Sequence, residues 1–269
     1  MTEDRLFPDP QNMGAFYVRF GPTSQSYVDP YQPDFLMFQY VAHIALILEN
    51  SVFRAPEDER LRFVHIGGAG MTIPRYVAHL RPGTAQVVCE PDVELTEEVR
   101  RKIPLPPRSG SKVRDVDGRT GLSAMPSDWT DVVIVDAFKE LIVPGDLATA
   151  EALDEIRRVT RGESMVIFNV TDRAPFDWAK KLAGGLNERW RTTMFGMESD
   201  VYKGRRFGNL LLMATDGKPD IKAIERESSR RMFGYRWITG SAARKWPGGA
   251  LPYTDDTVKD SPGLQGRGW

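Results

Sequence analysis

The chain has 269 residues and an ordinary globular composition, with 41% hydrophobic and 27% charged residues. Its formal net charge of -1 provides no basic excess for binding nucleic acid, and no apolar run approaches the roughly 18 residues of a membrane span. The first residues lack a signal-peptide pattern, and the single cysteine, Cys89, cannot form an internal disulfide. We therefore expect a cytoplasmic α/β protein that binds neither nucleic acid nor membrane.

The first third of the chain predicts a small β region followed by a helix. Residues 1 to about 33 combine Pro, Gly and polar residues with short β-prone pieces, which predicts an N-terminal β-hairpin region. Residues 35–48 are mostly apolar and contain neither Gly nor Pro, which predicts a largely buried helix. The charged residues 49–60 are typical of a linker.

From residue 61 onward, short apolar runs alternate with helix-like stretches. The predicted strands are 63–66, 86–89, 112–116, 131–135, 164–168 and 210–213, and the predicted helices lie near 73–81, 93–103, 147–160 and 174–187. This alternation indicates βαβ units and a parallel sheet that is covered on both faces. A strand near 192–197 would complete a terminal antiparallel hairpin, and a helix is expected near 221–231. We expect three parts: 1–57, 58–217 and 218–269.

The ends of four predicted strands suggest a nucleotide site. The first strand runs into a turn with Gly67, Gly68 and Gly70, where the chain can pass close to a ligand. Glu90 ends the next strand about 20 residues later, where an acid can accept both ribose hydroxyls. Asp117-Gly118 and Asp136 end the third and fourth strands. One such aspartate is more often a cap or turn residue, but three acids after a glycine turn favour a nucleotide.

These segments resemble the spermidine synthase (polyamine aminopropyltransferase) family, and most closely its actinobacterial spermidine synthase-like members. The resemblance rests on His65-Ile-Gly-Gly-Ala-Gly-Met-Thr-Ile-Pro-Arg-Tyr76, Val88-Cys-Glu-Pro-Asp92 and Asp131-Val-Val-Ile-Val-Asp-Ala-Phe138. Gln25-Ser-Tyr-Val-Asp29, Val143-Pro-Gly-Asp-Leu-Ala-Thr149 and Gly204-Arg-Arg-Phe-Gly-Asn209 agree with it. The likeness covers roughly residues 17 to 262.

The resemblance implies a Rossmann-like class I methyltransferase fold: a mostly parallel seven-stranded sheet with a terminal antiparallel hairpin, preceded by a small N-terminal β region. The family transfers an aminopropyl group from decarboxylated S-adenosylmethionine to a diamine or other small amine, releases methylthioadenosine, uses no metal and often forms homodimers. By position it implies that Asp136 is catalytic and that Tyr27 and Lys139 contact the acceptor. The implied nucleoside-binding residues are Gly67, Gly68, Gly70, Glu90, Asp117, Gly118 and Gln25.

The amine half of the site departs from the family pattern. The family's glycine turn usually carries an Asp that can pair with the aminopropyl ammonium, and that place falls here on Gly70 or Met71. A second family Asp, which receives the diamine, is replaced by Lys139; Glu140 beside it is an alternative acid, although its side chain should point elsewhere if the backbone is extended there. The aromatic-His-Glu stretch of many members reads Phe38-Gln39-Tyr40 here.

Two other functions therefore stay open. The chain can be a methyltransferase that uses ordinary S-adenosylmethionine, whose carboxylate Arg75 would pair, or a nucleoside-binding homologue without catalysis. The segment 139–146 is predicted to be a lid over the strand ends. The three histidines lack ligand spacing, and we expect them to be structural.

Overall fold

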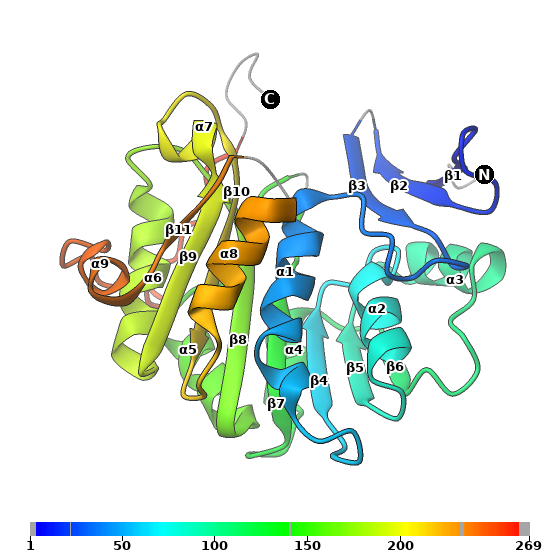
Figure 1. Ribbon diagram of the computed structural model, residues 1–269, viewed down its shortest axis with the longest axis horizontal. Helices are drawn as coiled ribbons and strands as arrows, with labels where there is room; N and C mark the ends of the chain where they lie inside the picture. The colour runs from blue at the N-terminus through cyan, green and yellow to red at the C-terminus, as the bar shows by residue number, and fades with distance from the viewer. Residues whose placement is uncertain (1–3, 22, 140, 232–233, 264–269) are drawn as a thin grey trace.

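Two β-sheets organise the chain, a small one at the N-terminus and a large one that forms the body of the protein (Figure 1). The computed structural model describes residues 4–21, 23–139, 141–231 and 234–263. In the described residues the large sheet has eight strands in the order β11-β9-β10-β8-β7-β4-β5-β6. They are β4 (Arg62–Ile66), β5 (Ala85–Cys89), β6 (Ser111–Arg114), β7 (Thr130–Val135), β8 (Thr160–Asp172), β9 (Thr192–Glu198), β10 (Gly208–Thr215) and β11 (Tyr235–Ile238).

The strand directions confirm the predicted Rossmann-like methyltransferase fold. Strands β4 to β8 pair in parallel, and β10 runs antiparallel to both β8 and β9, so β9 and β10 form the expected terminal hairpin. The sheet has one strand more than predicted, because β11 from the C-terminal part pairs antiparallel with β9. The four-residue strand is too short to give a clear periodic signal in the sequence.

Helices cover both faces of the large sheet because its central strands are apolar on both sides. In β7, Val133 and Val135 face one core while Val132 and Ile134 face the other. One face packs against α1 (Gln39–Glu49), α2 (Thr72–Leu80) and α8 (Ile221–Arg231). The other packs against α4 (Gly118–Ser123), α5 (Ala150–Val159), α6 (Asp177–Arg189) and α9 (Gly240–Lys245).

The N-terminal region is a three-stranded antiparallel sheet, one strand larger than the predicted hairpin. It consists of β1 (Leu6–Pro8), β2 (Phe16–Phe20) and β3 (Thr23–Val28). Its buried side packs against α3 (Val93–Lys102) and the turn that precedes α2. This contact places the small sheet over the ends of β4 and β5, on the side where the nucleotide site is predicted (Figure 1).

Several element boundaries differ from the predictions. The first helix begins at Gln39 rather than near residue 35, and the strand predicted over 112–116 ends at Arg114. Helix α4, which contains two glycines, was not predicted, and the hairpin connection contains the short helix α7 (Ser199–Tyr202). Two 3-10 turns, η1 (Val52–Arg54) and η2 (Gly145–Leu147), complete the elements.

The three-part division at residues 57/58 and 217/218 stays a prediction. Contacts in the described residues cross both boundaries. Helix α1 contributes Ile44 and Ile47 to the same core as Ile134 of β7. The ring of His43 stacks on Tyr235 of β11, with 3.6 Å between the ring centroids. None of the described helices is long and apolar enough to cross a membrane.

Candidate active site

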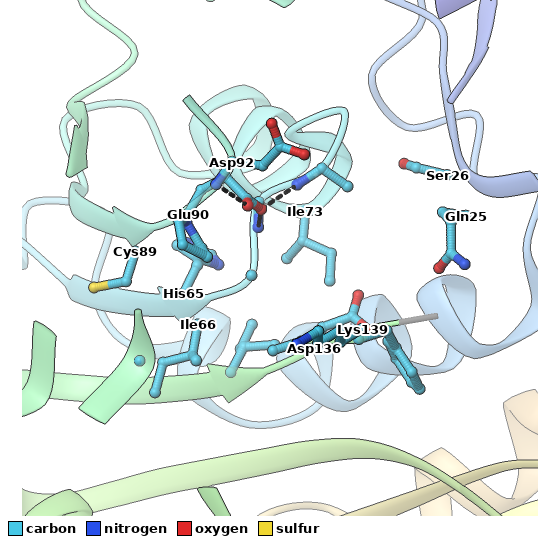
Figure 2. A pocket seen from close by; sticks show the side chains of 18 of the residues that line it. Gln25, Ser26, His65, Ile66, Ile73, Cys89, Glu90, Asp92, Asp136 and Lys139 are labelled. Carbon is cyan, nitrogen blue, oxygen red and sulfur yellow. Dashed lines mark hydrogen bonds between the residues drawn. The ribbon is translucent and has the colours of Figure 1, made fainter. Parts of the chain in front are cut away.

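A cavity of about 450 Å³ lies at the carboxyl ends of β4, β5 and β7, the edge where ligands bind in open parallel sheets. The small N-terminal sheet borders it on the opposite side through residues of β3 (Figure 2). The cavity is lined by every predicted site residue except Gly70 and Tyr27, that is by Gln25, Gly67, Gly68, Glu90, Asp117, Gly118, Asp136 and Lys139. Residues distant in the sequence therefore meet at one site, as the parallel strand ends predicted.

The turn after β4 passes directly against the end of β7. Gly67 has a φ of +92°, and a Cβ atom there would lie 2.2 Å from the carbonyl oxygen of Asp136. Only glycine combines this left-handed backbone with so close an approach. The turn therefore holds the glycine segment and the Asp136 strand end in one fixed arrangement.

The carboxylate of Glu90 joins the end of β5 to the same turn. Its Oε2 accepts hydrogen bonds from the backbone N–H groups of Gly68 (2.8 Å) and Ala69 (3.0 Å), and its Oε1 accepts one from Asp92 N (3.0 Å; Figure 2). Each carboxylate oxygen has two lone pairs, so Oε1 keeps one lone pair with which it can accept a hydrogen bond from a ribose hydroxyl. Glu90 thus both orders the turn and presents a carboxylate at the cavity wall.

Asp117 caps α4 at the mouth of the cavity. Its Oδ1 accepts from the backbone N–H of Thr120 and its Oδ2 from the Thr120 hydroxyl, both at 2.8 Å. These hydrogen bonds, chiefly that from the backbone N–H, lower the pKa of Asp117. The cap expected of an ordinary strand-end aspartate is present, and the residue also lines the cavity.

Asp136 is a half-buried carboxylate at the end of β7. Burial raises its pKa from 3.8 to about 6, against hydrogen bonds from Asn169 and Tyr40 that lower it. Asn169 Nδ2 donates to Asp136 Oδ1 at 2.8 Å, and the Tyr40 hydroxyl is the second donor. Burial and the charge of Asp136 raise the pKa of Tyr40 well above 10, so the phenol stays protonated and donates. The result is an oriented base that is ionised at neutral pH.

Asn169 and Tyr40, which surround Asp136, were not predicted as site residues. Asn169 is fully buried in β8, and its Oδ1 accepts from Asn209 Nδ2 of β10 at 2.9 Å, which fixes the direction of its amide toward Asp136. A polar side chain at the end of an apolar strand was the available signal for Asn169. Tyr40 lies in the stretch that departs from the family pattern, and nothing in its spacing indicated a contact with Asp136.

Gly70 and Tyr27 lie outside the lining of the cavity, and the roles that the resemblance implied for them stay predictions. A Cβ atom at Gly70 would lie 2.5 Å from Val28 Cγ2, so Gly70 allows the turn to pack against the small sheet. Tyr27 is 2% exposed, and its hydroxyl donates to Asp9 Oδ2 at 2.8 Å. Its backbone oxygen accepts from Thr72 Oγ1 at 2.9 Å, which joins β3 to α2. Both residues therefore help to hold the small sheet against the turn and α2, next to the cavity.

Arg75 does not face the cavity, which corrects the suggestion that it pairs with a ligand carboxylate. It is 2% exposed, and its guanidinium donates to the backbone oxygens of Ile103 and, at 3.0 Å, Pro104. Burial lowers its pKa to about 10. Its described contacts join α2 to the end of α3, which is a structural role.

The predicted lid over 139–146 is fixed along its second half. Val143 exchanges hydrogen bonds with Ser261, and Gly145 N donates to Asp260 Oδ1 at 2.8 Å. A Cβ atom at Gly145 would lie 2.2 Å from the Lys259 backbone oxygen. The C-terminal segment thus holds this part of the loop, while Lys139 is exposed at the cavity; Glu140 lies outside the described residues.

Two of the three histidines, His43 and His65, are hydrogen-bonded within the fold. His43 Nδ1 is 2.7 Å from Gln39 O and its Nε2 is 2.9 Å from Ser228 Oγ, while His65 Nε2 is 2.8 Å from Gln86 Oε1. His65 also borders the cavity, and burial lowers the pKa of both imidazoles to about 4. The described residues contain no group of three or more His, Cys, Asp or Glu able to hold a metal ion.

Comparison with known proteins agrees with this fold. No family model matches the sequence. The chain is 23% identical to the polyamine aminopropyltransferase of Vibrio vulnificus (strain CMCP6) over 132 residues, 48% of this chain and 43% of that protein. The match therefore spans less than half the length of the curated relative.

Solved structures show the likeness over nearly the whole chain. A probable spermidine synthase from Corynebacterium glutamicum ATCC 13032 superimposes with a TM-score of 0.86 at 25% identity, covering 97% of this chain and 93% of that one. A spermidine synthase in complex with the transition state analogue AdoDATO gives a TM-score of 0.56 at 16% identity, covering 85% and 73%.

The chain therefore has the class I methyltransferase fold. Within that class the chain is spermidine synthase-like, which confirms the resemblance stated from its motifs.

Proposed function

We propose that this protein transfers an aminopropyl group from decarboxylated S-adenosylmethionine to a small amine and releases methylthioadenosine. The observation that supports this most directly is the half-buried Asp136 carboxylate, with its pKa raised to about 6, in the cavity that also contains Gly67 and Glu90. The likeness to aminopropyltransferases gives the reaction class independent support.

The proposed reaction is a direct displacement at carbon. The lone pair of the acceptor amine attacks the propyl carbon bonded to the sulfonium, the C–S bond breaks, and its electron pair stays on sulfur as the neutral thioether of methylthioadenosine. The amine must lose a proton, and the Asp136 carboxylate accepts it as a positioned base. Sulfonium is a good leaving group, so alignment of the two reactants accounts for much of the acceleration.

The donor's nucleoside fits the half of the cavity that follows β4, β5 and β6. Glu90 would accept a ribose hydroxyl with the remaining lone pair of its Oε1, and Asp117 at the cavity mouth would accept from the adenine amino group. Gly67 and Gly68 leave room for the ligand beside the backbone. A cavity of about 450 Å³ is within the usual range for small-molecule sites.

Methyl transfer from ordinary S-adenosylmethionine is the second candidate, and the position of Gly70 favours it. The family places an acid there to hold the aminopropyl ammonium, whereas Gly70 packs against Val18 and Val28. Without that acid, the ammonium group of decarboxylated S-adenosylmethionine has no carboxylate beside it. Ordinary S-adenosylmethionine still carries its own carboxylate next to that group.

The decisive experiment incubates the protein with decarboxylated S-adenosylmethionine and a panel of amines, and measures methylthioadenosine by chromatography. A parallel set contains S-adenosylmethionine, scored for S-adenosylhomocysteine. We expect methylthioadenosine only, and none with Asp136→Asn, whose affinity for methylthioadenosine should stay within a few-fold of wild type. Asp34→Asn, the same change at an exposed site, serves as the matched control. S-adenosylhomocysteine release instead would establish methyl transfer, and no thermal shift with any of these ligands would refute the nucleoside site.

A further inference from the structure

A second cavity, of about 320 Å³, adjoins the nucleoside cavity and shares Gln25, Tyr40 and Phe138 with it. It lies at the ends of β8, β9, β10 and β11, beside the start of α1. Two of its lining residues, Tyr40 and Asn169, are the hydrogen-bond donors to Asp136. We call it the acceptor cavity, because a molecule bound there lies next to Asp136 on the side away from the ribose and adenine residues.

The walls of the acceptor cavity combine apolar rings with uncharged polar groups. Phe38 and Phe138 offer apolar surface for a methylene chain. The amides of Gln39 and Asn209 and the hydroxyl of Thr171 offer hydrogen bonds without formal charge. Such a lining suits a short aliphatic molecule with a neutral polar end.

The acidic group of this cavity is already paired with a positive charge. Glu198 is the one acid among its described lining residues, and its carboxylate is ion-paired with Arg206. Lys139, exposed at the adjoining nucleoside cavity, adds another cation. The second ammonium group of a diamine would therefore find no free carboxylate to pair with among the described lining residues. Burying such an unpaired charge is costly.

We propose that the acceptor is a monoamine with an uncharged hydrogen-bonding group at its far end, as in a short amino alcohol, rather than a diamine. The inference rests on the proposed function: Asp136 serves the one reacting nitrogen. The far hydroxyl pairs with an amide of the acceptor cavity, and no second ammonium is accommodated. A site built to pair a hydroxyl discriminates against molecules that lack it.

The test compares three amines with the same four-carbon chain: aminobutanol, putrescine and butylamine. Values of kcat/KM are measured from methylthioadenosine release with decarboxylated S-adenosylmethionine. We expect aminobutanol to exceed each of the other two by about tenfold or more. A smaller ratio in either comparison, or a preference for putrescine, overturns the inference.

Arg206→Gln tests the cause of the preference. The substitution frees the Glu198 carboxylate, so the ratio of aminobutanol to putrescine should fall about tenfold. Arg205→Gln is the matched control, because Arg205 pairs with Asp200 at the surface and does not line the acceptor cavity. If Arg206→Gln fails to fold by circular dichroism, Gln39→Glu supplies a carboxylate at another lining residue, whose side chain is exposed. An unchanged ratio in the folded variant contradicts the charge argument.

Binding separates failure of this inference from failure of the proposed function. Dissociation constants of the three amines are measured by calorimetry on the protein saturated with methylthioadenosine. If no amine reacts but aminobutanol binds tightest by about tenfold, the acceptor class is supported and the transfer reaction is refuted. If methylthioadenosine is released but putrescine is preferred, the reaction stands and the acceptor class is refuted.

Discussion

Replacing Asp136 by Asn should stabilise the folded protein at pH 8, although it should abolish turnover. The structure raises the pKa of this carboxyl from 3.8 to about 6, chiefly because the surrounding protein removes water from it. An amide of nearly the same shape avoids that penalty. It can still accept hydrogen bonds from Asn169 and Tyr40 through its Oδ1 atom.

The size of the effect follows from the shift in pKa. Each pKa unit corresponds to about 1.4 kcal/mol, so a rise of about two units corresponds to roughly 3 kcal/mol. Asp136 borders the cavity, where water offsets part of the cost, so we expect about 1–2 kcal/mol. This is a substantial fraction of the stability of an average domain.

The pH dependence has a defined sign. Because the folded-state pKa of Asp136 is the higher one, the folded protein binds more protons than the unfolded chain between pH 3.8 and about 6. The contribution of Asp136 to the free energy of unfolding of the wild type therefore falls as the pH rises through that window. The advantage of Asp136→Asn should be full above pH 6 and should shrink toward pH 4.

Urea unfolding followed by circular dichroism at pH 8 and pH 4.5 measures both features. Asp34→Asn controls for the change in net charge, since Asp34 is exposed on the surface. A variant that is less stable than wild type by the same amount at both pH values would refute the reasoning. It would mean that the hydrogen bonds to the carboxylate outweigh its loss of hydration.

Three further substitutions test other parts of the site. Tyr40→Phe removes a donor that lowers the pKa of Asp136, so the apparent pKa on the acidic side of the kcat/KM profile should rise above about 6. An unchanged apparent pKa would exclude the contact. Gly67→Ala should destabilise by more than 2 kcal/mol in urea, whereas Gly83→Ala, at a similar φ but in open space, should cost about 1 kcal/mol; equal losses would contradict the crowding argument. Glu90→Gln should weaken methylthioadenosine binding about tenfold or more by calorimetry, and unchanged affinity would remove Glu90 from the nucleoside site.

The alternation of apolar runs and helices was sufficient to predict the central fold. Strands β4, β5 and β7 begin within one residue of their predicted positions, because buried parallel strands need continuous apolar runs. Elements with mixed composition were harder to predict. Helix α4 was missed because its glycines are poor helix formers, and β11 because four residues give little periodic signal.

The sequence by itself determined which strand ends meet at the proposed nucleoside site. Gly67, Glu90 and Asp117 each end or follow a predicted strand, and parallel strands bring such positions to one edge of the sheet. Local pattern was enough for these residues, because each is placed by the strand to which it belongs.

Only the tertiary structure decided how Asp136 is surrounded. Asn169 reaches it from a neighbouring strand, Tyr40 from a helix nearly a hundred residues earlier in the chain, and Ser261 holds the loop beyond it. The same packing removed Gly70 and Tyr27 from the cavity by pressing the small sheet against the turn. These contacts depend on how separate elements pack, which the spacing of residues along one strand or helix does not encode.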